Sequence, residues 1–450
     1  MVIKGDLSHS VGNDWGQSCY CMAMMRGIHK IEKPTLSWVL YDWGNSAYAT
    51  TVMAGFFPIF FKEYWSAGVA ATQSTFYLGI ANSLASLLIV ILAPLLGAIA
   101  DQCAARKRFL LFFAFLGVSM TALLPLVAKG EWQWAVMFYV IASVGFSGSI
   151  SFYDSLIVFV TSPSRLDVVS AVGYAMGYLG GGLLFALNVS MTLDPELFGL
   201  ADAAEAVRLS FFSVAVWWLL FTLPLALWVH EPDGKGGNAL LAVRNGLRQL
   251  RDTFYEIRQL RTVFMFLLAY WCYIDGVDTI VRMAVDYGLS LGFDSNSLIV
   301  ALLITQFVGF PSAIAFGYLG KRIGAKRGIY LALIAYVLIV VWASRMESQG
   351  EFYGLAIAIG LVQGGIQSLS RSFYARLIPH DKSAEFFGFY NMLGKFAAVF
   401  GPLMVGWVGV LSGNPRIGIL TLLLLFFLGA LLLSRVGDGE PVGDIKVVTY

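Results

Sequence analysis

Long apolar runs recur along the whole chain, each about 18 or more residues long and almost free of charge. Such a run forms a helix that can cross a bilayer, where every backbone polar group must be bonded within its own segment. The composition agrees, because 58% of the 450 residues are hydrophobic and 13% are charged. Soluble domains are about half apolar and a quarter charged. The sequence therefore predicts an all-α polytopic membrane protein.

The runs predict about twelve transmembrane helices, separated by short loops rich in Gly, Pro, Ser and charge. The expected spans are 36–61, 76–100, 109–128, 134–160, 168–190, 208–229, 263–288, 297–320, 328–344, 352–375, 385–410 and 417–434. The expected domains are an N-terminal tail at 1–33, a six-helix bundle at 34–230, a linker at 231–262, a second six-helix bundle at 263–436 and a C-terminal tail at 437–450.

The N-terminal tail and the linker are the two long polar stretches. Residues 1–33 have no apolar core of a signal peptide, so they are either a disordered tail or an over-long reading of the gene. In the linker, apolar residues from Leu240 to Ile257 recur at three- and four-residue spacing, with arginines off that stripe. This pattern predicts an amphipathic helix on the inner membrane face. We interpret it as a tether between the halves, with a regulatory role as the alternative.

The distribution of Lys and Arg predicts the orientation. With the N-terminus placed inside, the tails and inner loops hold 22 of these residues and the outer loops hold 5. Positive residues favour the cytoplasmic side. We therefore expect both termini in the cytoplasm, in a cell membrane of bacterial type.

Two loops 220 residues apart look like repeats of one another. GAIADQCAARKR starts at Gly97 and GYLGKRIGAKR starts at Gly317, and each leads from a glycine to a basic cluster. Their matching places predict two pseudo-symmetric six-helix halves in parallel orientation, as in one class of transporters. The residues expected to act in conformational change are Gly97, Asp101, Arg106, Lys107, Gly317, Lys321 and Lys326.

Ionisable residues inside the spans carry the strongest functional signal. They are Asp42, Asp154, Asp275, Asp278, Arg282 and Arg371. Each costs about 3 kcal/mol at the centre of a lipid-facing helix, so they are expected to pair or to line a wet cavity. They fall on spans one, four, seven and ten, which predicts a central pathway lined by four related helices.

Polar residues on the same spans complete this predicted pathway. The residues expected to line or gate it are Asp42, Asn45, Asp154, Gln363, Gln367 and Arg371. Arg371 is expected either to close a cytoplasmic gate with one of the acids or to extend toward the interface. Lys395 in span eleven lies outside the pattern, and pairing with an acid is the one interpretation available for it.

Span seven holds a separate group of charges. Asp275, Asp278 and Arg282 are spaced three and four apart, which places them on one helical face. We interpret them as a cluster that couples transport to protons, an acid changing protonation beside a mobile arginine. The alternative is a permanent ion pair that fixes helix packing.

Enzymatic and nucleic-acid functions find little support. All four histidines lie in tails or loops, which excludes an intramembrane His-Glu-x-x-His metal site. There is no Walker loop, and a formal net charge of +2 gives no sign of a nucleic-acid partner. We therefore expect no enzyme activity and no cofactor.

Three separated stretches carry a family resemblance. They are LYDWGNSAYATT from Leu40, SAVGYAMGYLGGG from Ser170, and QGGIQSLSRSFYARLIP with AEFFGFY between Gln363 and Tyr390. Together with the repeated loops, they resemble the vacuole-effluxer family of the major facilitator superfamily, in its bacterial-type branch, over residues 34–434. Asp154 stands where an Asn is commoner in that family.

The resemblance implies two six-helix bundles around a central cavity and export of neutral amino acids by alternating access. With the intramembrane charges, it predicts a monomeric secondary transporter that uses protons as coupling ion. The alternative from another class is a receptor, an assembly scaffold or a lipid scramblase on the same fold.

Overall fold

The computed structural model describes residues 32–69, 71–231, 252–290 and 295–437. Within these ranges the chain forms helices and no strand. Eleven of the described helices are long and apolar enough to cross a membrane. The helical segment from Lys33 to Trp65, which precedes them, supplies the first of twelve spans. The prediction of an all-α polytopic membrane protein is confirmed.

The first half contains six long helical segments. The elements are α2 (Lys33–Ala47), a π-helix (Tyr48–Phe56), α3 (Phe57–Phe60), a second π-helix (Phe61–Trp65), α4 (Ala71–Cys103), α5 (Arg106–Leu123), α6 (Trp132–Val160), α7 (Leu166–Leu193) and α8 (Ala203–Trp228). Short 3-10 turns at Leu124–Leu126, Pro163–Arg165 and Glu196–Phe198 lie between them.

The second half repeats this plan. The elements are α10 (Arg261–Ser290), α11 (Ser295–Ile323), α12 (Ala325–Ala343), α13 (Gln349–Leu377), a 3-10 turn (His380–Lys382), α14 (Ser383–Ser412), α15 (Pro415–Leu420) and α16 (Leu422–Ser434). The last two elements form the twelfth span.

Local sequence signals mark several helix ends. Pro34 occupies the first turn of α2, where its missing N–H costs nothing. Ser348 and Glu351 form a reciprocal capping box at the start of α13. Gly413 adopts a left-handed conformation (φ 65°) that ends α14.

The first span departs from regular α-helix along its middle. In the π-helical stretch Tyr48–Phe56, backbone N–H groups donate to the carbonyl five residues earlier. The Phe57 N–H, for example, donates to the Val52 carbonyl. Such wide turns are rare and are frequently found at functional sites. No feature of the sequence predicted it.

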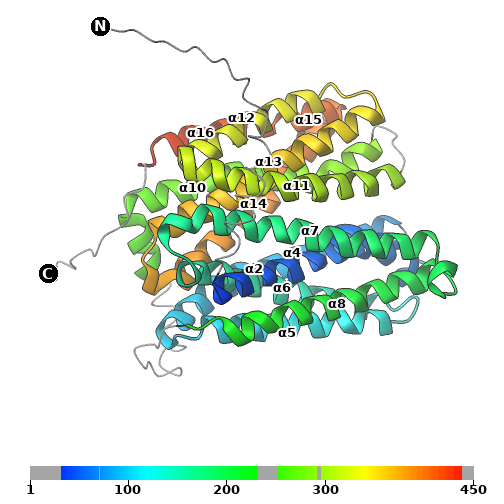
Figure 1. The fold of residues 1–450 in the computed structure, drawn as a ribbon. Helices are drawn as coiled ribbons and strands as arrows, with labels where there is room; N and C mark the ends of the chain where they lie inside the picture. Colours follow the sequence, from blue (N-terminus) through cyan, green and yellow to red (C-terminus); the bar gives the residue numbers. More distant parts are fainter. Residues whose placement is uncertain (1–31, 70, 232–251, 291–294, 438–450) are drawn as a thin grey trace, which may run out of the picture.

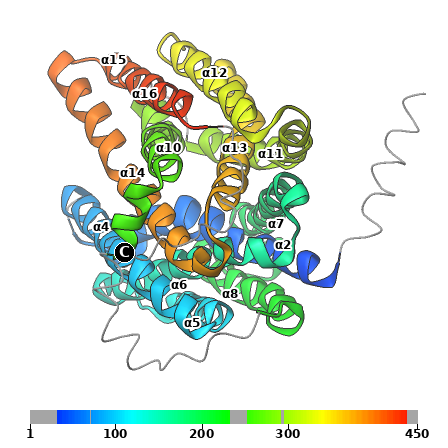
Figure 2. The same ribbon diagram turned by 90° about the vertical axis from the view of Figure 1, so that its left-hand side faces the viewer.

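The two halves lie side by side as two bundles (Figure 1). Helices α2 to α8 form one and α10 to α16 the other, and the end-on view shows the same division (Figure 2). Between the bundles, α7 packs against α11 and α13, while α14 packs against α4 and α6. The end of the molecule that faces the viewer in Figure 2 holds the turn between α4 and α5 and the start of α10, and we call it the linker end.

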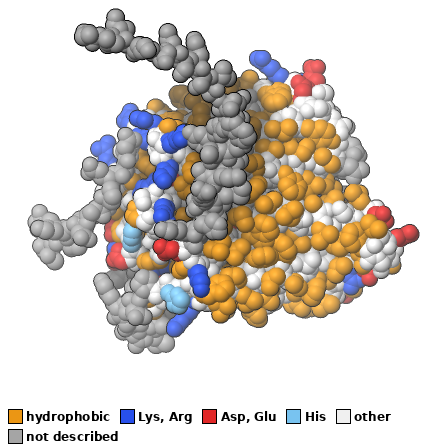
Figure 3. All heavy atoms as spheres, viewed as in Figure 1, with side chains coloured by type: hydrophobic (Ala, Val, Ile, Leu, Met, Phe, Trp, Pro, Cys, Tyr) orange, Lys and Arg blue, Asp and Glu red, His pale blue; other side chains and the backbone are white. Residues whose placement is uncertain are grey.

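An apolar belt covers the middle of the molecule between its two ends (Figure 3). In this view Lys and Arg side chains gather at the linker end, on the left, and the middle is almost free of charge. A belt of this kind fits the hydrocarbon core of a bilayer.

Two predictions fall on residues outside the described ranges. The N-terminal tail at 1–33 is described only from Glu32, and Lys33 already belongs to α2. In the linker, residues 252–259 are helical, while most of the predicted amphipathic helix lies outside the described residues.

Candidate functional site

A polar cavity of about 340 Å³ lies between the two bundles. The first bundle contributes wall residues from α2, the π-helix, α6 and α7, and the second contributes them from α10, α11, α13 and α14. Pockets for small molecules have volumes of about 300–1,000 Å³, so this one suits a small solute. All six residues predicted to line a pathway are on its wall: Asp42, Asn45, Asp154, Gln363, Gln367 and Arg371.

Arg371 is the central charged residue at one end of the cavity, which we call the cavity floor. It lies two turns before the end of α13, and only 2% of it is exposed. Its Nη1 donates to Asp154 Oδ1 at 3.0 Å, and its Nε and Nη2 donate to the Ser170 hydroxyl and carbonyl at 2.9 and 2.8 Å. Every one of these bonds joins the second bundle to the first. Arg371 therefore does not extend to the interface, which was one of the two alternatives for it.

The two acids on the floor share this arginine. Asp42 Oδ2 lies 3.9 Å from Arg371 Nη1 and accepts the Tyr153 hydroxyl at 3.1 Å. Asp154 also accepts the Asn391 side-chain amide at 3.2 Å. The floor thus holds two carboxylates and one guanidinium, all buried, with hydrogen bonds that compensate their lost hydration.

Aromatic rings enclose the Arg371 guanidinium. Its central carbon lies 4.2 Å from the ring centre of Tyr174, 4.9 Å from Trp38 and 5.4 Å from Tyr153. Trp38 and Tyr153 stack on each other with centroids 4.3 Å apart. Cation–π contacts of this kind stabilise a desolvated arginine.

Neutral polar groups line the rest of the wall. The Tyr178 hydroxyl donates to Gln367 Oε1 at 3.2 Å, and Gln306 Nε2 donates to the Thr50 hydroxyl at 3.0 Å, both across the bundle interface. Gln363 Oε1 is buried without a partner among the described residues. A buried acceptor of this kind is costly unless a solute or water satisfies it.

The three residues predicted to couple transport lie off the cavity wall. Asp275 accepts the backbone N–H of Gly401 in α14 at 2.8 Å, next to Pro402 in the middle of that helix. Asp278 and Arg282 form no ion pair within 4.0 Å among the described residues. The permanent ion pair considered for span seven is therefore not present between these two side chains.

Lys395 on α14 lines the cavity, one turn beyond Asn391. Pairing with an acid was the only interpretation that the sequence offered for it. Among the described residues, no carboxylate oxygen lies within 4.0 Å of its amine, so this interpretation is wrong. The charges that act on it from a distance are those of Asp278 and Arg282 on α10.

The first repeated loop joins the bundles at the linker end. Asp101, at the end of α4, accepts the backbone N–H groups of Ala384 and Glu385 at 3.1 and 2.7 Å. A carboxylate at a helix N-terminus is favourable, and here the helix is α14 of the other bundle. Arg106 pairs with Asp101 at 2.6 Å and with Glu231 at 2.8 Å.

The other predicted loop residues have simpler surroundings. Lys107 donates to the Val229 carbonyl at 2.7 Å and Lys326 to the Val436 carbonyl at 2.5 Å, while Lys321 is exposed. A Cβ on Gly97 would lie 2.5 Å from the Ala384 carbonyl oxygen, and one on Gly317 would lie 2.4 Å from the Ala171 Cβ. Both glycines thus allow close contact between helices of different bundles.

The two repeated loops each hold a residue with positive φ, at positions 220 residues apart. Gly324 in the second loop has φ 89°, and Ala104 in the first has φ 46°. Only glycine adopts such angles without steric cost, so the first loop carries strain that the second avoids.

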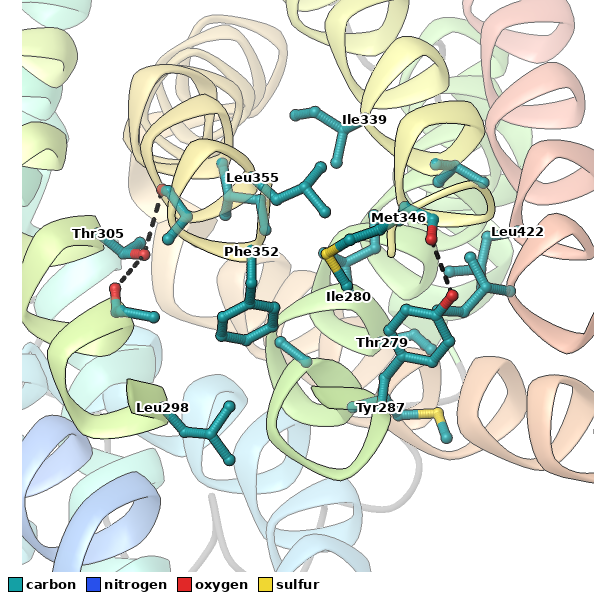
Figure 4. A pocket seen from close by; sticks show the side chains of 18 of the residues that line it. Thr279, Ile280, Tyr287, Leu298, Thr305, Ile339, Met346, Phe352, Leu355 and Leu422 are labelled. Carbon is teal, nitrogen blue, oxygen red and sulfur yellow. Dashed lines mark hydrogen bonds between the residues drawn. The ribbon is translucent and has the colours of Figure 1, made fainter. Parts of the chain in front are cut away.

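A second cavity, of about 70 Å³, lies inside the second bundle (Figure 4). Its wall is apolar apart from a few hydroxyls, and Thr305 and Tyr287 bond to backbone carbonyls there. It is too small and too apolar for a polar solute. Among the described residues, no group of three His, Cys, Asp or Glu side chains could hold a metal ion.

Several contacts across the bundle interface were not predicted. Asp167 pairs with Arg376 at 2.7 Å and accepts the Ser372 hydroxyl at 2.6 Å. Four-residue spacing links Tyr174 with Tyr178 on α7, and Asn391 with Lys395 on α14, so their shared helix faces were visible in the sequence. The partner of each face was not.

The sequence matches the family described as vacuole effluxer Atg22 like, over residues 66–165 and 161–438. An uncharacterized MFS-type transporter of Bacillus subtilis strain 168, YxiO, is 39% identical over 425 residues, which are 94% of this chain and 98% of YxiO. Autophagy-related protein 22 of Coccidioides immitis is 26% identical over 420 residues, covering 77% of this chain and 70% of the relative. Against autophagy-related protein 22-2 of Aspergillus clavatus the match covers 46% of the relative, so the chain spans about half its length.

Solved structures share the fold. The human organic anion transporter MFSD10 has a TM-score of 0.70 at 17% identity, covering 89% of this chain and 99% of that one. The proton:xylose symporter XylE has a TM-score of 0.64 at 14% identity, covering 93% and 96%. These structures establish the major facilitator fold with its two six-helix bundles.

Proposed function

Because this chain belongs to the vacuole effluxer Atg22-like family of the major facilitator superfamily, and is a membrane transporter, we propose that it moves a small solute by alternating access as a secondary active transporter. The observation that carries the proposal is the cavity between the bundles, whose polar wall comes from both of them. Relative motion of the bundles would open such a site to either side of the membrane in turn.

Neutral amino acids are the proposed solute. The cavity wall holds the acids Asp42 and Asp154 and the cations Arg371 and Lys395, so its formal charges balance. A balanced set of separated charges suits a zwitterion, which brings no net charge into the membrane. The family resemblance points the same way and favours export.

The contacts at the linker end supply the proposed closed gate. Arg371 with Asp154, Asp167 with Arg376, and Asp101 with the start of α14 all join one bundle to the other there. Opening the cavity toward the linker end would require these bonds to break together. The strong charge-assisted bonds would then re-form when the solute has left.

Proton coupling is the proposed energy source. Asp275, Asp278 and Arg282 lie together on α10, behind the cavity wall, where a change in their protonation would change the electrostatic potential at Lys395.

We place the protein, as a monomer, in a bacterial inner membrane with both termini in the cytoplasm, since the basic residues gather at the linker end (Figure 3). No enzyme activity is assigned to it.

Uptake into proteoliposomes tests this function. Labelled leucine, tyrosine and other neutral amino acids would be offered with and without an imposed pH gradient. Saturable uptake stimulated by the gradient is the expected result. Saturable uptake that ignores pH would leave a facilitator, and no flux of any amino acid would overturn the proposed solute.

The variant Asp278→Asn tests the coupling. It removes the titratable group while keeping shape, so gradient-driven uptake should be lost and exchange of solute at equal pH should persist. Gradient-driven uptake that survives at every pH would show that Asp278 does not couple. A receptor, scaffold or scramblase would give no saturable solute flux with either protein.

A further inference from the structure

Lys395 is an unpaired cation inside the membrane. It lies near the middle of α14, one turn beyond Asn391, and it reaches the cavity wall. No described carboxylate oxygen lies within 4.0 Å of its amine, and no described group forms a hydrogen bond with it. A charge in such a place is costly unless it serves a ligand or an ion path.

Of the two cations on the cavity wall, only Lys395 is not already engaged and can bind an anionic group. Each of the three nitrogens of Arg371 already donates a hydrogen bond to Asp154 or Ser170. The nearby Arg282 is not on the cavity wall, and it repels Lys395 instead of neutralising it. Lys395 is therefore the one cation of this wall that forms no hydrogen bond or ion pair among the described residues.

The unpaired Gln363 carbonyl gives a second, independent sign of a ligand. Its Oε1 is buried without a partner among the described residues, on the same cavity wall. A cation without a carboxylate and an acceptor without a donor are complementary to a molecule that carries both a carboxylate and an N–H group.

We propose that Lys395 binds the carboxylate of the transported solute and so restricts transport to carboxylate-bearing solutes. This rests on the proposed transport function and adds the residue that sets its specificity. The ammonium donates charge-assisted hydrogen bonds to the carboxylate oxygens, and Gln363 Oε1 accepts from the solute's amino group. In the empty cavity the distant Asp278 attracts Lys395 while Arg282 repels it, so the charge of Lys395 is not neutralised.

The first test compares leucine with leucinamide, which lacks the carboxylate. In wild-type proteoliposomes, unlabelled leucine should compete with labelled leucine and leucinamide should not. In Lys395→Gln the KM for leucine should rise about tenfold to hundredfold, because a charge-assisted hydrogen bond is lost. The preference for leucine over leucinamide should fall with it.

Two further variants separate binding from folding. Lys395→Arg keeps the charge and should recover most of the leucine affinity. Lys62→Gln removes an exposed lysine at the far end of the first span and should leave the KM unchanged. Thermal stability of Lys395→Gln should equal or exceed that of the wild type, since the change removes an uncompensated charge. An unchanged KM and an unchanged preference in Lys395→Gln would overturn the proposal.

A binding measurement distinguishes failure of this inference from failure of the proposed function. Purified protein in detergent would be heated with leucine, other organic carboxylates or their amides. Stabilisation by carboxylates alone, lost in Lys395→Gln, supports the carboxylate site even if no amino acid is transported. If amides stabilise the protein as much as carboxylates do, or if Lys395→Gln keeps the selectivity, the site is not there.

Discussion

The Arg371 guanidinium lies in a low-dielectric interior with one bonded carboxylate and a second carboxylate 3.9 Å away. Its Nε and Nη2 donate to Ser170, and three aromatic rings surround it. Each ion in this group is costly to bury, and the others make it tolerable. The group therefore holds together only as a whole.

Removing one charge from this buried group should therefore lower the free energy of unfolding more than removing two opposite charges. Arg371→Gln leaves Asp154 buried without its cation and should lower the free energy of unfolding by about 3–5 kcal/mol. The double variant Arg371→Gln with Asp154→Asn removes both charges and should recover a large part of that loss. Thermal unfolding of the purified proteins measures both, and simple additivity of the two changes would contradict the account.

Strain at Ala104 gives a second prediction at the scale of one residue. Ala104→Gly should stabilise the protein by up to about 1 kcal/mol, because glycine adopts φ 46° without steric cost. The matched control is Ala105→Gly, where φ is −121° and glycine only adds freedom to the unfolded chain. Opposite shifts of the unfolding temperature are expected, and equal shifts would show that the bend carries no strain.

Residue spacing grouped several residues of the cavity wall on shared helix faces but did not identify their partners. Gln363, Gln367 and Arg371 are four residues apart, so helix geometry alone places them on one face. The same rule grouped Asp275 with Asp278, yet Asp275 bonds to α14 and neither residue is on the cavity wall. Periodicity tells which residues share a face, and tertiary packing decides what the face meets.

At the scale of elements, the start of α14 depends on a residue of the other bundle. Asp101 accepts the N–H groups of Ala384 and Glu385 in the first turn of α14, while Gly97 lets α4 approach that turn closely. The repeat in the sequence predicted that this loop matters for conformational change. It could not identify α14 as the helix that the loop holds.

Loss of this contact should favour opening at the linker end. Asp101→Asn should weaken the interaction with the α14 N-terminus by up to about 2 kcal/mol, because a neutral amide replaces a buried carboxylate. A cysteine at the linker end of the cavity should then react faster with a membrane-impermeant reagent. Asp381→Asn is the control, since it removes a neighbouring exposed carboxylate that forms no described bond. Equal rates in the two variants would contradict a locking role for Asp101.

At the scale of the whole molecule, apolar run length predicted most of the fold. Eleven of the described helices could cross a membrane and lie where the runs predicted them, and the apolar belt follows from the same residues (Figure 3). The π-helical middle of the first span was not predicted, because its apolar residues would fit an α-helix equally well. The prediction that the bundles surround one cavity came from the intramembrane charges, because such charges are too costly on a helix face in contact with lipid.

The central claim is that the solute passes through the cavity between the bundles, and protection of a single cysteine tests it most directly. With the four native cysteines replaced by serine, Ala49→Cys would place a thiol on the cavity wall and Ala301→Cys one in the small apolar cavity. We predict that leucine slows alkylation at position 49 but not at 301, and that alkylation at 49 abolishes transport. Full transport after complete alkylation at position 49 would contradict the account.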